Sequence, residues 1–212
     1  MNLDRLLKNL DKKEYKNFKK LPIHKGSDNI VFDYIIVSRY GVFPIDIVDH
    51  VGTVYGSEKD KEWKIYTKNN GIYKFSSPIE TIYKKINKLN SIFSDVEQDA
   101  YNPIVIFPNK AKLMVENVSI PVINKDYLVT AIKRFRDVAI NDLKFNYLIQ
   151  IFPLFKTNKS NFVIPRLFKK EKEEPKIEKC PLCNSPLIYK EGEFGDYYIC
   201  SNFPACRYRQ EA

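Results

Sequence analysis

Four cysteines near the C-terminal end of the chain have the type and spacing of a metal site. Two residues separate Cys180 from Cys183, five separate Cys200 from Cys206, and about 16 lie between the pairs. Thiolates are the ligands that zinc prefers in closed tetrahedral sites, and a segment this short needs metal to fold. Disulfides or free thiols are the alternative, but the rest of the chain holds no cysteine, which is typical of a reducing compartment. The sequence therefore predicts structural Zn²⁺ on a small ribbon.

Aromatic and basic residues are frequent around these cysteines. Exposed rings that stack on bases, together with cations that contact phosphates, bind single strands without sequence preference. Some of the rings, about half, are expected to cover the small core instead. The candidate nucleic-acid contacts in this segment are Tyr197, Tyr198, Arg207 and Tyr208.

The segment CPLCNSPLIYKEGEFGDYYICSNFPACRY resembles the C-terminal four-cysteine zinc ribbons of bacterial type IA DNA topoisomerases. The longer gap in the second cysteine pair, which holds an asparagine and a proline, is the most distinctive part of the resemblance. In that family these ribbons bind single-stranded DNA. The resemblance implies the same partner for this chain.

The body of the chain resembles the nuclease-related domain called NERD over roughly residues 1–145. The resemblance rests on short segments in a specific order, namely 32–38, 40–46, 52–56 with Trp63, 77–79 and 103–108. That family is a branch of the PD-(D/E)xK, restriction-endonuclease-like fold, and it often carries this zinc ribbon. The resemblance implies an α/β fold with a mixed sheet flanked by helices.

Nucleases of that fold need one acid on a strand, then an acid and a lysine two residues apart on the next strand. The acids hold Mg²⁺, and the lysine helps to position water and stabilise charge. Asp33 matches the first acid and Asp46 the second, but Val48 occupies the lysine position. A lysine could instead come from the neighbouring helix, with Lys84, Lys85 and Lys88 as candidates. The alternative is that both acids are ordinary strand-end or surface residues.

Two further family positions align loosely. Asp4 is the one acid near the position of a glutamate in the first helix, and the family's glutamine after the 77–78 turn becomes Glu80 or Thr81. The polar residue expected just before Asp33 is also missing.

Periodicity predicts the elements that position these residues. Leucines at helical spacing predict an opening helix that ends before Lys20, and 29–48 reads as two strands joined at 39–41. Three short strands follow, and then a helix begins at Pro78 with Lys84, Lys85 and Lys88 outside its apolar face. The run 102–108 predicts a buried strand, two more strands follow, and two helices end the body. Strands alternate with helices, which indicates an α/β layered domain.

Composition divides the chain into a NERD-like domain over 1–152, a charged linker over 153–179 and the ribbon over 180–212. A net charge of +9 favours a polyanionic partner, although a lysine-rich composition inherited from an AT-rich genome would give the same excess. No apolar run is long enough to cross a bilayer, and the N-terminus lacks the apolar centre of a secretion signal. We therefore expect a cytoplasmic protein.

The replaced lysine favours a DNA-binding protein with a degenerate nuclease-related domain, rather than an enzyme, and a ribbon that binds single strands. Lys84, Lys85 and Lys88 would then add a basic surface. Two alternatives stay open. The first is an active Mg²⁺-dependent DNA nuclease that uses Asp33, Asp46 and a displaced lysine, and the second is a protein-interaction scaffold.

Overall fold

A computed structural model describes residues 1–25, 28–68, 71–94, 96–157, 179–190 and 196–211. The chain divides into two compact units, Met1–Leu167 and Phe168–Ala212. Most of the predicted linker, residues 158–178, lies outside the described residues. Among those that are described, no helix has both the length and the apolar character needed to cross a membrane.

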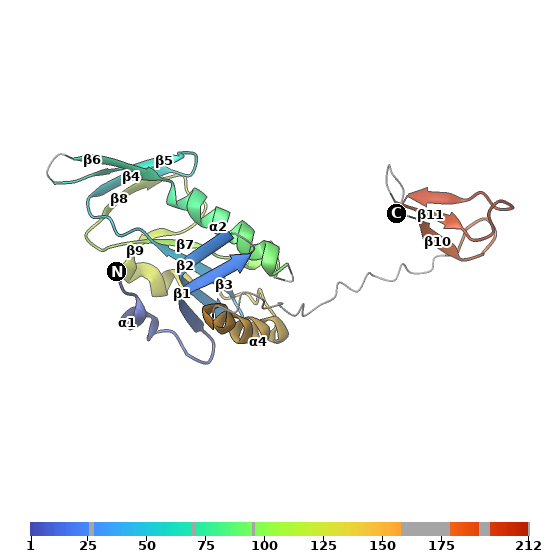
Figure 1. Cartoon of the computed structure of the whole chain (residues 1–212), viewed down its shortest axis with the longest axis horizontal. Helices are drawn as coiled ribbons and strands as arrows, with labels where there is room; N and C mark the ends of the chain where they lie inside the picture. Colours follow the sequence, from blue (N-terminus) through green and yellow to red (C-terminus); the bar gives the residue numbers. More distant parts are fainter. Residues whose placement is uncertain (26–27, 69–70, 95, 158–178, 191–195, 212) are drawn as a thin grey trace. The chain divides into compact units, whose positions relative to one another are not determined.

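The first unit is built on a mixed five-stranded sheet in the order β1-β2-β3-β7-β9 (Figure 1). β1 (Lys16–Lys25), β2 (Asp28–Ser38) and β3 (Gly41–Ile47) form an antiparallel meander. β7 (Ile104–Phe107) pairs parallel with β3, and β9 (Val122–Asn124) pairs parallel with β7. All four residues of β7 are buried, as expected for a strand covered on both faces.

Helices cover both faces of this sheet. α2 (Pro78–Ile92) and α4 (Asp142–Ile151) pack into the larger core together with Phe32, Ile35 and Val105 of the sheet. The short helices α1 (Asp4–Leu7) and α3 (Leu128–Ile132) belong to a second core on the opposite side. The described residues of the unit also include three 3₁₀ turns, at Gln98–Ala100, Lys125–Tyr127 and Phe152–Thr157.

The start of α2 and the face that it buries are set by its N-cap and by the spacing of its apolar residues. The Ser77 side chain accepts a hydrogen bond from the backbone N–H of Glu80, and Pro78 occupies the first turn, where its missing N–H costs nothing. The buried residues of the helix recur every three or four positions, at Ile79, Ile82, Ile86 and Leu89. This spacing fixes which side chains of the helix point toward the sheet.

A second, four-stranded sheet has the order β6-β5-β4-β8. Its strands are β4 (Thr53–Ser57), β5 (Glu62–Tyr66), β6 (Ile72–Ser76) and β8 (Lys112–Glu116). Burial alternates strictly along β5, and Val54, Trp63 and Ile65 on the inner face join the larger core. The outer face of this sheet is exposed.

The predicted N-terminal helix is wrong in extent. α1 is only four residues long, and β1 already begins at Lys16, where helix was expected up to Lys20. The reason is tertiary, because β1 gains a ladder with β2 that runs from the Lys16–Val37 pair to the Lys25–Asp28 pair. The other predicted strands and the helix from Pro78 are found, although β9 begins only after Pro121 and α3 is short.

The second unit contains a three-stranded antiparallel sheet, β10-β11-β12. β10 (Leu187–Lys190) pairs with β11 (Tyr197–Cys200), which pairs with β12 (Arg209–Glu211). Its small core consists of three cysteines and Leu187, with Tyr198 and Tyr208 packed against it. The predicted fold class, a mixed α/β sheet flanked by helices plus a small ribbon, is confirmed.

Candidate functional site

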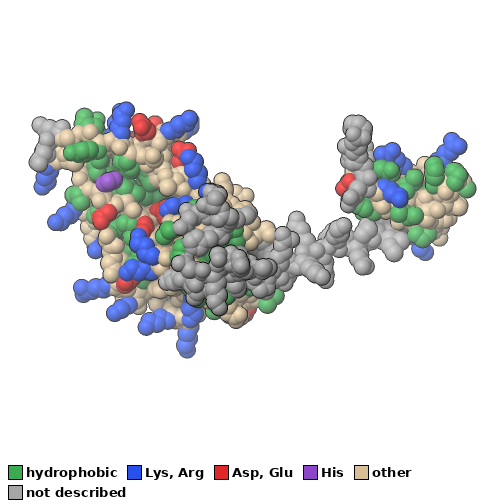
Figure 2. Space-filling view, in the orientation of Figure 1, with side chains coloured by type: hydrophobic (Ala, Val, Ile, Leu, Met, Phe, Trp, Pro, Cys, Tyr) green, Lys and Arg blue, Asp and Glu red, His purple; other side chains and the backbone are tan. Residues whose placement is uncertain are grey.

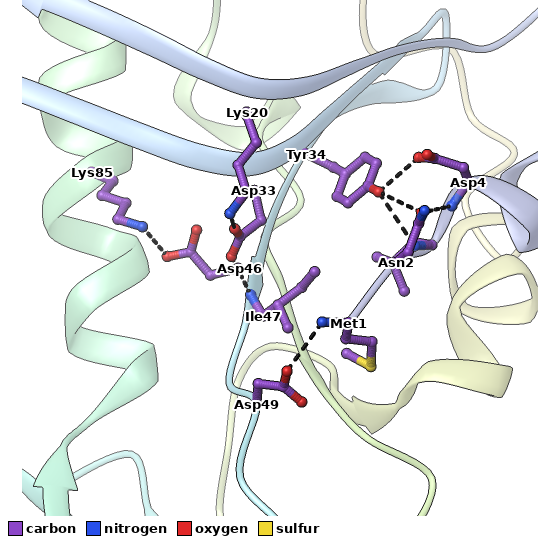
Figure 3. A network of polar contacts seen from close by, with 11 residues as sticks. Met1, Asn2, Asp4, Lys20, Asp33, Tyr34, Asp46, Ile47, Asp49 and Lys85 are labelled. Atoms are coloured by element: carbon purple, nitrogen blue, oxygen red, sulfur yellow. Dashed lines mark hydrogen bonds and ion pairs between the residues drawn. The ribbon is translucent and has the colours of Figure 1, made fainter.

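β2 and β3 bring Asp33 and Asp46 together. Their ladder pairs Tyr34 with Ile45, so the two acids lie one step further along at opposing positions and on the same face of the sheet. Asp33 Oδ2 accepts a hydrogen bond of 2.8 Å from the backbone N–H of Ile47, the residue after Asp46 (Figure 3). The side chains alternate along β3, so Asp46 points toward the face that α2 covers.

α2 supplies a lysine to this acid pair. Lys85 Nζ lies 2.5 Å from Asp46 Oδ2, and the two side chains are 23% and 9% exposed (Figure 3). The same ammonium lies 5.7 Å from the centre of the Phe32 ring. Lys85 is three residues after the buried Ile82 and four before the buried Leu89, so it borders the face of the helix that packs on the sheet. Of the three predicted lysines, Lys85 is therefore the one beside the acids.

The other two lysines of the helix lie elsewhere. Lys84 forms a 2.6 Å ion pair with Glu80, four residues earlier and exposed. Lys88 is exposed one turn after Lys84. Neither has a contact with Asp33 or Asp46 among the ion pairs of the described residues.

Asp46 is in an electrostatic setting that suits a cation. Burial raises the pKa of its carboxyl group above the ordinary value, and the Lys85 ammonium offsets only part of this effect. Its Oδ1 atom is buried and has no hydrogen-bond partner among the described residues. Hard cations such as Mg²⁺ prefer carboxylate oxygens, so Asp46 and the neighbouring Asp33 fit such an ion.

Lys20 is a second cation at the site, and no sequence pattern predicts its place there. Its Nζ donates to Asp33 Oδ1, and its side chain is mostly exposed. Lys20 has a φ of +47°, and the β1–β2 register omits the Lys20–Asp33 pair between Lys19–Tyr34 and Leu21–Phe32. A non-glycine residue in this region is strained, and such strain is frequent at functional sites. A local distortion of the ladder cannot be read from residue types.

Val48, at the family's lysine position, is partly buried and packs against the larger core. Asp4 is on the other side of the sheet from Asp46, where its Oδ1 accepts a 2.7 Å hydrogen bond from the Tyr34 hydroxyl (Figure 3). It also pairs with Lys19 at 2.7 Å. Asp4 therefore does not contribute to the acid pair.

The loosely aligned Glu80 and Thr81 are engaged within their own helix. Glu80 pairs with Lys84, and the Thr81 hydroxyl donates to the Ser77 carbonyl oxygen at 2.8 Å. Neither has a hydrogen bond or ion pair with Asp33 or Asp46 in the described part of the chain.

The four cysteines of the second unit form one cluster. Their sulfur atoms all lie within 4.8 Å of one another, with 3.6 Å between Cys180 and Cys206 and 3.3 Å between Cys183 and Cys200. Four thiolates at about 2.3 Å from a tetrahedral zinc would be about 3.8 Å apart, so this donor set fits Zn²⁺. Three of the cysteines are buried and Cys183 is exposed, as at the edge of a closed structural site.

The predicted nucleic-acid contacts of the ribbon fall into two groups. Tyr198 and Tyr208 are half-buried and pack against the cysteine core. Tyr197 points from the other face of β11, where the Arg209 guanidinium lies 3.8 Å from its ring centre. Arg207 is exposed. All three rings are half-buried, and two of them pack against the small core; their contacts with nucleic acid stay a prediction.

Basic side chains are spread over the first unit. Figure 2 shows lysine and arginine side chains around much of the face in view, with few acidic ones among them. The whole chain has 35 basic and 26 acidic residues. This excess suits a polyanionic partner.

A family model described as the nuclease-related domain, NERD, matches residues 2–108, half of the 212-residue chain. The chain belongs to the NERD family. A second model, described as the topoisomerase DNA binding C4 zinc finger, matches residues 177–212 of this NERD protein. The ribbon is therefore of the topoisomerase type with a structural zinc, and both resemblances predicted from sequence are confirmed. No solved structure matches the NERD chain.

Proposed function

We propose that this NERD protein is a metal-dependent DNA nuclease whose body carries the catalytic site and whose ribbon binds single-stranded DNA. The observation that supports catalysis is the 2.5 Å contact between Lys85 and Asp46, because it returns a lysine to an acid pair that lacks the motif lysine. The family matches support a function on nucleic acid. They do not separate an active nuclease from a degenerate one.

The chain's own residues would divide the chemistry. Asp33 and Asp46 would hold Mg²⁺, which when bound polarises the scissile phosphate and lowers the pKa of its water. The Lys85 ammonium would stabilise the charge that develops on the phosphate oxygens, a contribution that does not depend on which element carries the lysine. Lys20, which is exposed, would approach the phosphate backbone beside the cleaved bond.

A degenerate, DNA-binding protein is the second candidate. Both Asp33 oxygens already have partners, Lys20 and the Ile47 N–H, and Val48 is apolar. If these contacts persist with DNA bound, the acid pair lacks the freedom to take a metal ion.

The test is cleavage of single- and double-stranded DNA and of RNA by the full-length protein, with Mg²⁺, with Mn²⁺ or without divalent ions. The ion-free arm should omit chelator, because EDTA would also remove the ribbon zinc. We expect metal-dependent cutting that an Asp33→Asn/Asp46→Asn variant loses. Equal cutting by that variant would reveal a contaminating nuclease. DNA binding without cutting would favour the degenerate candidate. Cutting of RNA alone would mean that the substrate is RNA and not DNA.

A further inference from the structure

The outer face of the four-stranded sheet carries a group of tyrosines and lysines that the acid-pair site does not use. Side chains alternate along each strand, so the residues between the buried Val54, Trp63 and Ile65 point outward. We call the outward group the platform. Its members are Tyr55, Lys64, Tyr66, Lys74, Lys112 and Met114.

The rings of the platform are exposed and adjacent. Tyr55 is 44% and Tyr66 42% exposed, and their ring centres are 5.3 Å apart with an interplanar angle of 78°. Met114, directly opposite Tyr55 on β8, is also exposed. Single exposed apolar residues are ordinary, but a contiguous group across neighbouring strands marks an interaction surface.

The lysines of the platform lie closer together than stability alone would favour. Lys64 and Lys74 are directly opposite each other on β5 and β6, and like charges at such positions are destabilising. Lys112 is opposite Thr53, whose other neighbour is Tyr66. An anion bound between these cations would relieve the repulsion.

The outer face of this sheet also carries two acidic residues, Glu62 and Glu116, at one end. Glu62 Oε2 lies 3.6 Å from Lys74, with both side chains largely exposed, and Glu116 is opposite Ser57. Glu62 and Glu116 are both two positions along their strands from the platform residues Lys64 and Met114. The positive charge is therefore concentrated across the rows that contain the two tyrosines.

We propose that the platform binds a single strand of nucleic acid, with bases stacked on Tyr55 and Tyr66 and phosphates at Lys64, Lys74 and Lys112. Aromatic rings on an open sheet, bordered by cations, are how single strands are bound without base-specific hydrogen bonds. A dry protein interface would bury the charges of these three lysines at a cost, which makes it the less suitable occupant.

The platform is separate from the acid pair but connected to it through the chain. β3 carries Asp46 and ends at Ile47, and β4 begins at Thr53. Figure 2 shows basic and hydrophobic side chains, with some acidic ones among them, along the edge of the unit that Figure 1 labels β4 to β6. Binding here would need neither cleavage nor zinc, so the inference goes beyond the proposed function and does not depend on it.

The first test is the affinity of the full-length Asp46→Asn protein for a fluorescent oligothymidine, measured by anisotropy without divalent ions. Adding Tyr55→Ala and Tyr66→Ala should raise Kd about 25-fold or more, because each ring that stacks on a base contributes at least about fivefold. The matched control is Tyr127→Ala, which removes a tyrosine that is 63% exposed on another part of the unit. It should leave Kd unchanged.

The second test is the salt dependence of the same binding. Replacing Lys64, Lys74 and Lys112 with glutamine should reduce the slope of log K against log salt by about 2, because each phosphate contact on a single strand contributes about 0.7. Replacing three exposed lysines elsewhere, Lys8, Lys13 and Lys133, is the control for general charge.

Photo-crosslinking with 4-thiothymidine distinguishes the platform from the ribbon. Crosslinks in peptides from β4 and β5 are expected, and their loss in the tyrosine variant would support the platform. Crosslinks in the ribbon alone, with unchanged Kd and salt slope, would overturn the inference. A wild-type dimer that the tyrosine variant converts to a monomer would also overturn it, because the face would then be a contact between two copies. None of these outcomes depends on whether the protein cuts DNA.

Discussion

Replacing Lys85 with methionine would remove the ammonium beside Asp46 and keep a side chain of similar length. If Lys85 is the displaced lysine, the cleavage rate should fall about 10²- to 10³-fold, the usual loss for one group that stabilises transition-state charge. Lys84→Met is the matched control, because Lys84 is the adjacent residue, is 71% exposed and forms its ion pair with Glu80 rather than with the acid pair. Its effect on the rate should be less than about twofold if the surface pair contributes little.

Lys85→Met should also lower the free energy of unfolding, and the exposed fractions of Lys85 and Asp46 indicate by how much. Exposed ion pairs contribute up to about 1 kcal/mol, whereas breaking a buried pair costs about 3–5 kcal/mol. With Asp46 only 9% exposed and Lys85 23% exposed, we expect a loss of about 2–3 kcal/mol at neutral pH. Lowering the pH through the raised pKa of Asp46 should recover part of it, because the neutral carboxyl is cheaper to bury. Denaturant unfolding of both variants at two pH values measures this.

A rescue experiment separates catalysis from folding. Val48 is two residues after Asp46, one position beyond the end of β3, and packs against the larger core, so Val48→Lys in the Lys85→Met background restores the motif position of the fold. Recovery of cleavage would identify Lys85 as a substitute for that lysine. A Lys85→Met protein that is folded and cuts DNA at the wild-type rate would refute the assignment.

Three further outcomes are expected. Zinc removal should unfold the ribbon and weaken single-strand binding. The thermal transition of the body, followed by circular dichroism, should keep its midpoint, because neither body core contains a cysteine. A shifted body transition would contradict this. Gly56→Ala should destabilise the body by about 1–3 kcal/mol in denaturant unfolding, because the new Cβ would lie 2.3 Å from the Trp63 ring. Gly71→Ala is the control and should lower the free energy of unfolding much less, because its new Cβ would lie 3.0 Å from the Tyr73 ring. Tyr34→Phe should lower the free energy of unfolding by about 1–2 kcal/mol, because the Tyr34 hydroxyl donates a hydrogen bond to Asp4 and accepts one from the Leu3 N–H. A melting temperature equal to that of wild type would show that water replaces these hydrogen bonds.

Much of the architecture could be predicted from local patterns. The apolar spacing of Ile79, Ile82 and Ile86 specifies a helix with one buried face. The alternation of apolar and polar residues around Trp63 specifies a strand with one buried face. The cysteine spacing was enough to predict the zinc ribbon, because metal ligation depends on few residues. These features are fixed by neighbours in sequence.

The site could be predicted only in part, because its lysines depend on packing. Helical periodicity left Lys84, Lys85 and Lys88 equivalent, and only the docking of α2 on the sheet brings Lys85 to Asp46. The sequence predicted a helix that ends before Lys20, since the leucines have helical spacing, and local patterns carry no information on the long-range ladder that places Lys20 in β1. The catalytic roles of Asp33 and Asp46, and the DNA contacts of the ribbon tyrosines, stay predictions.

A lysine carried by a helix changes what the site responds to. A motif lysine on β3 would move with Asp46 as part of one strand, whereas Lys85 reaches Asp46 only while Ile79, Ile82 and Ile86 hold α2 against the sheet. A small rotation or slide of that helix would separate the two charges without unfolding anything. Activity would therefore depend on how α2 packs on the sheet, and substitutions in the buried face of that helix should lower the cleavage rate even where the strands that carry Asp33 and Asp46 are unchanged.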